Sequence, residues 1–310
     1  MSDELIRPRG IAIIGGGAIG SLFGAVLAEL GHQVVICGRR PNPRQTLRVD
    51  HGNETLLQPV EAITDPARAQ PVDWILLATK AYDTNTATAW LRGLLGPSTK
   101  VAVLQNGIDQ VDRVRPLLPP AVSIVPAVMY IAAELIETGH ALWTFGETVA
   151  VPDDPAAEDF ARLFTGARLR IVRRPDFAVA AWKKIMVNIA TNPITTLTGR
   201  RMEVFADPGI VSLGGTLLQE AVMAGRAAGV ELSDQDAADA RQMIRELAPS
   251  TGTSMLYDHL AGRPTEHDLI LGAVARVAET HGTPAPATNA LLALLQVLPE
   301  RTGAALSDAA

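Results

Sequence analysis

Short apolar runs alternate with longer stretches of helical pattern through the first half of the chain. Runs that are rich in β-branched residues and bounded by turn-forming residues are typical of buried strands. Five such strands are predicted, at Ile11–Ile14, Gln33–Cys37, Trp74–Ala78, Val101–Leu104 and Ser123–Met129. A helix is predicted over Ala18–Leu30, with Gly31 as its C-terminal cap. Strands that alternate with helices indicate a parallel sheet with crossover connections.

Strand-like runs become rare in the second half of the chain. Three more short strands are predicted before Pro175, at Ala141–Phe145, Thr148–Val151 and Leu169–Val172. Beyond it the apolar positions follow a helical period, and helices are predicted at Asp176–Asn192, Gly209–Ala228, Ser233–Leu247, Glu266–Thr280 and Pro286–Leu298. We therefore predict an α/β domain over residues 1–174 and an all-α domain over residues 175–310, which agrees with the two domains expected for 310 residues.

Composition narrows the class of protein. Hydrophobic residues make up 47% of the chain and charged residues 19%, which supports a large core and excludes intrinsic disorder. The net charge of −6 lacks the basic bias of proteins that bind nucleic acids or anionic membranes. Cys37 is the only cysteine, so no intramolecular disulfide forms, and we expect a reducing, cytoplasmic location. No histidine pair has helical metal-site spacing, and no metal centre is predicted.

The segment from Gly10 to Ala28 is uncharged and has the length of a membrane-spanning helix. It is interrupted by glycines and changes from a β-branched half to a helix-like half, which is not the pattern of a spanning helix. We predict a strand, a glycine-rich turn and a helix here, and no membrane segment.

The turn in this segment carries the sequence Gly15-Gly16-Gly17-Ala18-Ile19-Gly20, which fits G-x-G-x-x-G. This pattern predicts dinucleotide binding when it follows a strand and opens a helix. In that motif Gly15 permits a tight turn, Gly17 lets the backbone approach a pyrophosphate, and Gly20 allows the helix to pack closely on the strand. The alternative is a glycine-rich turn in an α/β protein that binds no nucleotide. We predict a Rossmann-type, doubly wound parallel sheet that binds a dinucleotide.

The end of the second predicted strand indicates which dinucleotide is bound. NAD enzymes usually carry Asp or Glu about 20 residues after the glycine motif, where the carboxylate bonds the ribose 2′-hydroxyl. Here the strand is followed by Gly38-Arg39-Arg40, with no carboxylate. Because a guanidinium suits a 2′-phosphate, NADP(H) is favoured, with Arg39 as the better ligand. For Arg40 a solvated surface charge is an equal alternative.

Two polar residues follow later strands of the predicted sheet. Lys80 comes after Trp74–Ala78, and Asn106 follows Val101–Leu104 within Gln105-Asn106-Gly107. Ligands of open α/β sheets bind outside the carboxyl ends of the strands, so both residues are placed where the cofactor should lie. A solvated loop lysine and an ordinary turn asparagine are the alternatives.

The first predicted helix of the second domain carries polar residues on one face. Lys184, Asn188 and Asn192 are spaced i, i+4 and i+8, and their apolar neighbours indicate that the helix is largely buried. Buried polar groups need partners, which a ligand would supply. A partly desolvated lysine has a lowered pKa and can act as a general acid. The alternative is a solvated stripe on a helix that ends at Asn192-Pro193.

Ser254 and Glu266 belong to a second group of polar residues in this domain. In one interpretation the Glu266 carboxylate meets Lys184 across a cleft. In the other, Glu266 and Asp268 are favourable first-turn residues of a helix that Thr265 caps. A hydrolase site at Ser254 is not supported, because no G-x-S-x-G surrounds this serine.

Taken together, these motifs resemble the ketopantoate reductase (2-dehydropantoate 2-reductase) family over nearly the whole chain. They occur in family order: the glycine motif, Arg39, Lys80, Gln105-Asn106-Gly107, the W-x-K-x-x-x-N-x-x-x-N helix at Trp182–Asn192, Ser254-Met255, and Arg263-x-Thr265-Glu266-x-Asp268. His267 and Leu271 depart from the pattern, because the family often has an aliphatic and an Asn-like residue at these positions.

The resemblance implies the cofactor and the roles of the residues. Arg39 and Lys80 would hold the 2′-phosphate end of NADPH, and Lys184 would be the general acid, with Glu266 beside it and the substrate hydroxyl. The polar residues that would contact substrate or cofactor are Asn106, Asn188, Asn192 and Ser254.

The implied reaction is hydride transfer from NADPH to the ketone carbon of a small 2-oxo acid. The first candidate is 2-dehydropantoate, whose product pantoate serves pantothenate and coenzyme A synthesis. A reductase of another oxo acid and a non-catalytic NADP sensor are the alternatives. The helical half also has the character of an oligomerisation module, so a homodimer is a further possibility.

Overall fold

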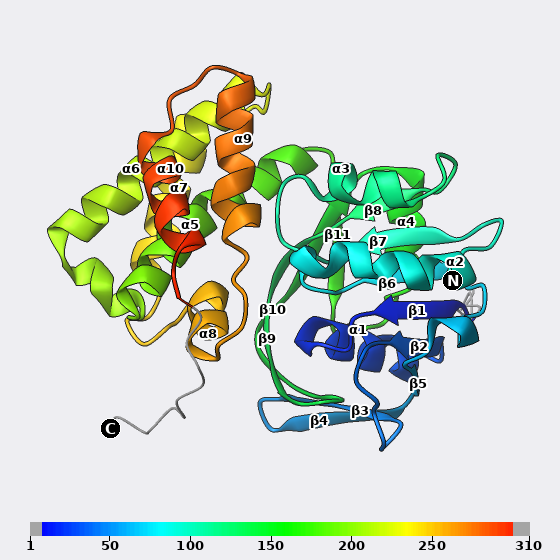
Figure 1. The fold of residues 1–310 in the computed structure, drawn as a ribbon. Coiled ribbons are helices and arrows are strands. Elements are labelled where there is room, and N and C mark those ends of the chain that lie inside the picture. The colour runs from blue at the N-terminus through cyan, green and yellow to red at the C-terminus, as the bar shows by residue number, and fades with distance from the viewer. Residues whose placement is uncertain (1–7, 300–310) are drawn as a thin grey trace. The chain divides into compact units, whose positions relative to one another are not determined.

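The computed structural model describes residues 8–299, and the chain divides into two compact units between Phe177 and Ala178 (Figure 1). As predicted, the first unit is α/β and the second is helical. The predicted domain limits, 1–174 and 175–310, stay a prediction, and residues 1–7 and 300–310 lie outside the described range. None of the helices within residues 8–299 has the length and hydrophobicity needed to cross a membrane.

A six-stranded parallel sheet is the centre of the first unit, with the strand order β5-β2-β1-β6-β7-β8. The strands are β1 (Gly10–Ile14), β2 (Gln33–Cys37), β5 (Glu61–Ile63), β6 (Trp74–Leu77), β7 (Lys100–Val103) and β8 (Ile124–Pro126). The first four predicted strands are therefore confirmed as β1, β2, β6 and β7. β1 pairs with β2 on one side and with β6 on the other, so the strand order reverses at β1. Ligands of open α/β sheets bind beside such a reversal, outside the carboxyl ends of the strands.

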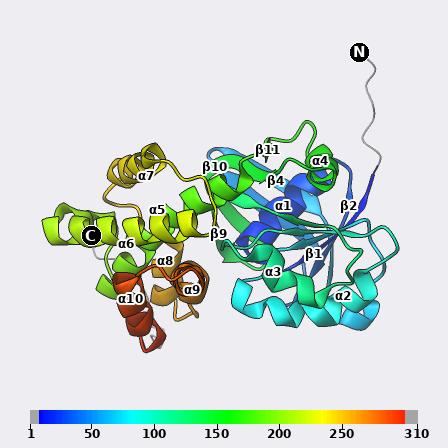
Figure 2. The ribbon, with the colours of Figure 1, turned by 90° about the horizontal axis from the view of Figure 1, so that it is seen from above.

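Both faces of this sheet are covered, which explains why its strands read as continuous apolar runs. Ile11 and Ile13 of β1 pack in the core that contains α1 (Ala18–Glu29). Ala12 and Ile14 pack in a second core with α2 (Thr88–Leu94) and with Val114 of α3 (Gln110–Val114). Figure 2 shows α1 and α2 on opposite sides of the parallel sheet.

A second sheet packs against the other side of α1. Its order is β11-β10-β3-β4, with β9 also paired to β10. The strands are β3 (Thr46–His51), β4 (Glu54–Pro59), β9 (Val128–Glu137), β10 (His140–Pro152) and β11 (Arg170–Arg174). The remaining helical segments of this unit are η1 (Pro66–Arg68), η2 (Ala81–Ala87), η3 (Arg115–Leu117) and α4 (Pro155–Arg162).

Several predicted strand limits after β7 were wrong. The strand predicted at Ser123–Met129 is divided between β8 and β9, and the two strands predicted at Ala141–Phe145 and Thr148–Val151 are a single strand, β10. The break within β10 is a bulge: the pairing with β9 shifts register there, and Gly146 has a φ of +70°. The hairpin of β3 and β4 was not predicted.

The second unit consists of helices within its described part. They are α5 (Phe177–Thr198), η4 (Met202–Ala206), α6 (Pro208–Ala227), α7 (Asp234–Glu246), α8 (Ser254–Leu260), the π-helical turn η5 (Asp268–Gly272), α9 (Ala273–Thr280) and α10 (Pro286–Gln296). Ser233 caps α7 in a capping box with Asp236. α6 packs against α7, α9 and α10.

The prediction that the first of these helices ends at Asn192 was wrong. α5 continues through Pro193 to Thr198. A proline inside a helix removes one backbone hydrogen bond and costs about 3 kcal/mol in an exposed helix. Here residues 189–196 are all buried, so the packing of this segment outweighs the cost of the proline.

Candidate active site

The glycine-rich turn after β1 is shaped by close backbone contacts. Gly15 has a φ of +114°, and its N–H donates to the Cys37 carbonyl oxygen at the end of β2 (2.9 Å). A Cβ on Gly20 would overlap the Gly15 carbonyl oxygen, so helix and turn meet there without room for a side chain. A Cβ on Gly17 would meet nothing within 4 Å. The backbone at Gly17 therefore borders open space.

The start of α1 is suited to an anion. Gly17 is its N-cap and provides no side-chain hydrogen bond to the first turn, and this turn contains no acidic residue. The first N–H groups of a helix lack intrahelical partners, and the helix dipole makes this end positive. A pyrophosphate at this position would supply both the acceptors and the negative charge.

The two glycines therefore differ in what an added methyl group would do. Gly17→Ala is expected to fold with an unchanged melting temperature and to raise the Kd for NADPH about tenfold or more, because the methyl would enter the space a pyrophosphate needs. Gly20→Ala is expected to destabilise the protein by about 1–3 kcal/mol through overpacking. Calorimetry and NADPH fluorescence titration test the pair, and a Gly17→Ala variant that binds NADPH normally would contradict the assignment.

Arg39 and Lys80 follow strands that lie on either side of β1. The Arg39 side chain is 79% exposed, and its Nη2 donates to Asp83 Oδ2 at 2.9 Å. Asp83 lies in η2, which half-buried Lys80 precedes as the N-cap residue. The ion pair therefore brings the loop after β2 to the loop after β6, next to the end of β1. No motif in the sequence indicated Asp83.

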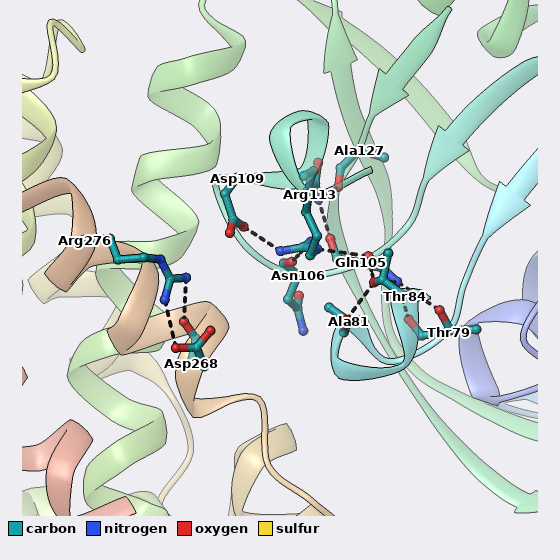
Figure 3. A network of polar contacts seen from close by, with 11 residues as sticks. Thr79, Ala81, Thr84, Gln105, Asn106, Asp109, Arg113, Ala127, Asp268 and Arg276 are labelled. Atoms are coloured by element: carbon teal, nitrogen blue, oxygen red, sulfur yellow. Dashed lines mark hydrogen bonds and ion pairs between the residues drawn. The ribbon is translucent and has the colours of Figure 1, made fainter. Parts of the chain in front are cut away.

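Asn106 lies in the turn after β7 and is half-buried. Its backbone carbonyl oxygen accepts a hydrogen bond from Arg113 Nη2 at 3.0 Å (Figure 3). The side chain of Gln105, which precedes it, is buried and contacts the loop after β6. Gln105 stands in the predicted motif, whereas Arg113 had no signal in the sequence.

Lys184 is held by α5 in the second unit, together with Asn188 and Asn192. Lys184 and Asn188 are half-buried and Asn192 is buried. Burial lowers the pKa of Lys184 to about 8, and the negative charge of Glu266 acts in the opposite direction. Glu266 is itself buried. The structure thus brings Lys184 and Glu266 within electrostatic reach of one another, although they lie far apart in sequence.

The adjacent lysine has a different environment. Lys183 Nζ forms an ion pair with Asp236 of α7 at 2.9 Å and a second with Asp239 at 3.4 Å. The hydrogen bond with Asp236 raises the pKa of Lys183. The two neighbouring lysines of α5 therefore face different partners.

The loop that carries Glu266 is held on both sides. Before it, Arg263 Nε donates to Asp258 Oδ1 at 2.9 Å. After it comes the π-helical turn η5, in which a Cβ on Gly272 would overlap the Asp268 carboxylate. Asp268 in turn pairs with Arg276 at 2.8 Å (Figure 3). π-helical turns are frequent at functional sites, and this one begins two residues after Glu266.

Ser254 is the exposed first residue of α8. The preceding residue, Thr253, caps α8, and its hydroxyl lies 2.7 Å from the hydroxyl of Thr195 on α5. This hydrogen bond joins the start of α8 to the same helix that carries Asn192. The hydroxyl of Thr265 contacts His267 Nδ1 at 2.8 Å.

Comparison with known proteins agrees with these features. The family model "Ketopantoate reductase PanE/ApbA" matches residues 11–155, and "Ketopantoate reductase PanE/ApbA C terminal" matches residues 176–298. The 2-dehydropantoate 2-reductase of Mycobacterium tuberculosis is 36% identical over 295 residues, which are 95% of this chain and 99% of that protein. The enzyme of the same name from Caulobacter vibrioides is 35% identical, over 92% of this chain and 97% of that protein.

Solved structures have the same fold. A PanE/ApbA family ketopantoate reductase from Ralstonia eutropha has a TM-score of 0.84 at 28% identity and covers 93% of this chain and 97% of its own. D-mandelate dehydrogenase, solved with NADH and anilino(oxo)acetate, has a TM-score of 0.83 at 22% identity, again over 93% of this chain and 97% of its own. By its two family models and its relatives, the chain belongs to the ketopantoate reductase family.

Proposed function

We propose that this protein reduces a small 2-oxo acid with NADPH, and that the substrate is 2-dehydropantoate, which becomes pantoate. The observation that carries the proposal is that buried Glu266 lies within electrostatic reach of half-buried Lys184. A protein that only senses NADP has no use for a lysine of lowered pKa beside a carboxylate. A reductase needs such a group, because negative charge develops on the carbonyl oxygen during reduction.

The first unit offers the residues to hold the dinucleotide. The open backbone at Gly17 and the start of α1 fit a pyrophosphate. Arg39 and Lys80 are the ligands we assign to the 2′-phosphate end, and Asn106 contacts cofactor or substrate. When bound, NADPH supplies the hydride that reduces the ketone carbon.

In the second unit, Lys184 Nζ donates the proton that the carbonyl oxygen of the substrate requires. Glu266 orients this ammonium group and keeps it protonated, because its negative charge raises the pKa of Lys184. Asn188, Asn192 and Ser254 offer hydrogen-bond donors for the substrate carboxylate and hydroxyl. With these donors already placed, little reorganisation is needed when charge develops on the substrate.

The remaining assignments concern partners and location. We propose that the protein works in the cytoplasm, in a reducing environment that keeps Cys37 as a thiol. Its ligands are small molecules, with no nucleic-acid or membrane partner. A homodimer is proposed as its assembly state, which sedimentation at working concentration tests.

The direct test is oxidation of NADPH by the purified protein in the presence of 2-dehydropantoate, run beside a series of other 2-oxo acids. We expect the highest kcat/KM with 2-dehydropantoate. A higher value with another 2-oxo acid would keep the reaction and change the substrate. NADPH binding without oxidation by any of these acids would favour a sensor.

Arg39→Ala is expected to lower the preference for NADPH over NADH by about ten- to a hundredfold, as the loss of hydrogen bonds to a charged phosphate implies. The measured quantity is the ratio of kcat/KM for the two cofactors. Arg44→Ala is the matched control, because Arg44 is another exposed arginine that pairs with a carboxylate, that of Glu137 at 2.6 Å. An unchanged ratio in Arg39→Ala would show that Arg39 does not bind the phosphate.

A further inference from the structure

The turn that carries Asn106 is built around the guanidinium of Arg113. This side chain comes from α3 and is only 14% exposed. Its Nη2 donates to the Asn106 carbonyl oxygen at 3.0 Å, and its Nη1 pairs with the Asp109 carboxylate at 2.5 Å (Figure 3). Its Nε donates to Gln105 Oε1 at 3.4 Å. One planar group with five donors thus contacts three acceptors along the turn, a geometry that an ammonium group does not match.

Gly107 shows how tightly this turn and the ion pair fit together. Its φ is +111°, in the region that favours glycine. A Cβ at this position would lie 2.9 Å from Asp109 Oδ1 and 3.2 Å from Arg113 Nη1. The ion pair therefore fills the space that a side chain at position 107 would take.

Gln105 extends the same network to the loop that carries Lys80. Its Nε2 donates to the Thr79 carbonyl oxygen at 3.1 Å and to the Thr84 hydroxyl at 3.0 Å. The Thr84 hydroxyl donates to the Ala81 carbonyl oxygen at 2.7 Å. Because Thr79 and Ala81 are the two neighbours of Lys80, Gln105 joins the loops that follow β6 and β7.

A second side chain from α3 fixes the backbone of this turn. Gln110 Nε2 donates to the carbonyl oxygens of Gln105 and of Ala127, the latter at 3.0 Å. Gln110 is buried, as is Gln105. The turn after β7 is therefore bonded to the β6 loop, to α3 and to the segment between β8 and β9.

We propose that Arg113 is a positioning residue: it fixes the direction of Asn106 and, through Gln105, of the loop that carries Lys80. It acts through these residues and does not touch the ligand. The inference rests on the proposed function, in which Asn106 and Lys80 contact cofactor or substrate. A turn that is already ordered loses less conformational freedom when a ligand binds, and a misplaced contact group costs up to about a hundredfold in rate.

The first variant is Arg113→Lys, which keeps the positive charge but not the planar fork. We expect it to fold, to raise the Kd for NADPH about tenfold and to lower kcat/KM with 2-dehydropantoate by about ten- to a hundredfold. Arg113→Met is expected to lose as much, because the geometry and not the charge holds the turn. Wild-type binding and turnover in Arg113→Lys would overturn the proposal, whatever Arg113→Met does.

Arg115→Met is the matched control, because Arg115 also holds a loop of this unit by its backbone. Its Nη2 donates to the Pro119 carbonyl oxygen at 3.0 Å and to the Val122 carbonyl oxygen at 3.1 Å. That loop leads into the amino end of β8, which pairs with β7 in parallel, whereas Asn106 follows the carboxyl end of β7; the two lie at opposite ends of these strands. We expect a lower melting temperature and an unchanged Kd for NADPH. An equal loss of binding in Arg115→Met would overturn the proposal, since general destabilisation would then explain both variants.

A double-mutant cycle with Asn106→Ala tests the route of the effect. Arg113→Lys is expected to cost clearly less in the Asn106→Ala background than in the wild-type protein, because part of its effect passes through that side chain. Fully additive losses of kcat/KM would overturn the proposal. Failure of the proposed function has a different signature, because it appears in the wild-type protein itself: that protein would bind no NADPH, or would bind NADPH without oxidising it in the presence of any 2-oxo acid.

Discussion

Lys184→Ala is expected to lower kcat for reduction of 2-dehydropantoate by about 10²–10⁴-fold, the contribution that a general acid typically makes. Burial brings the pKa of Lys184 down to about 8, so near neutral pH the group is mostly protonated and yet gives up its proton more readily than an exposed lysine does. The Kd for NADPH is expected to change little, because Gly17, Arg39 and Lys80 belong to the other unit. Steady-state oxidation of NADPH and fluorescence titration measure the two quantities separately.

Lys183→Ala is the matched control for this variant. The two lysines are adjacent on α5, but Lys183 pairs with Asp236 and Asp239 at the protein surface. We expect Lys183→Ala to keep kcat within about twofold and to lose at most about 1 kcal/mol of stability, as is usual for exposed ion pairs. If both variants lost turnover alike, or if Lys184→Ala weakened NADPH binding as much as it slowed turnover, Lys184 would not be the general acid.

The parallel sheet could be predicted because burial on two faces leaves a simple pattern. β1 and β6 are continuous apolar runs, and each is followed by glycine or polar residues at the carboxyl end of the sheet, where ligands are expected to bind. The second sheet left a weaker pattern. β3 alternates over a few positions, with Leu47 and Val49 buried between polar residues, but β4 does not, because Leu57 follows Leu56 directly and is exposed. In the sequence, a glycine between the two strands was the signal for a turn here. In the structure this residue, Gly52, has a φ of +58°.

Long-range packing explains the other two differences between the predicted and the observed helices. Pro193 is a strong helix-ending signal in a local reading, but the buried segment around it keeps α5 helical. The π-helical turn after Glu266 has no periodic signature, because the same apolar residues would also fit an ordinary helix. Both features depend on contacts between segments distant in sequence.

In the candidate site, too, some residues could be predicted from the sequence and others could not. Gly17, Lys184 and Glu266 belong to motifs whose residue types carry the chemistry, so the sequence pointed to them. Arg113 has its role only because α3 returns its side chain to the turn after β7. A sequence motif indicates which residues contact a ligand. The residues that position those contacts are identified only when the structure is known.

Glu266→Gln is expected to lower kcat at neutral pH by about ten- to a hundredfold, the range for loss of a hydrogen bond or ion pair with a charged group. It is also expected to move the pH profile. A general acid works only while protonated, so kcat/KM for reduction falls as pH rises through the pKa of Lys184, about 8 in the wild-type protein. Because the charge of Glu266 raises that pKa, its removal shifts the alkaline limb to lower pH.

This shift can be assigned to Lys184, because the other titrating group near Glu266 acts at lower pH and because a control variant is available. The pKa of nearby His267 is lowered below its ordinary value of 6.5 by burial, so its titration falls on the acid side of the profile. Glu220 provides the matched control, since it is another buried carboxylate of the same unit and accepts hydrogen bonds from the N–H groups of Ala287 (2.9 Å) and Thr288 (2.8 Å) at the start of α10.

Glu220→Gln is therefore expected to lower the melting temperature and to leave the alkaline limb where it is. Profiles of kcat/KM across neutral to alkaline pH, measured for the wild-type protein and both variants, decide the matter. An alkaline limb that stays in place in Glu266→Gln would mean that Glu266 does not govern the proton on Lys184. A shift in Glu220→Gln as large as in Glu266→Gln would assign the effect to any buried carboxylate of this unit.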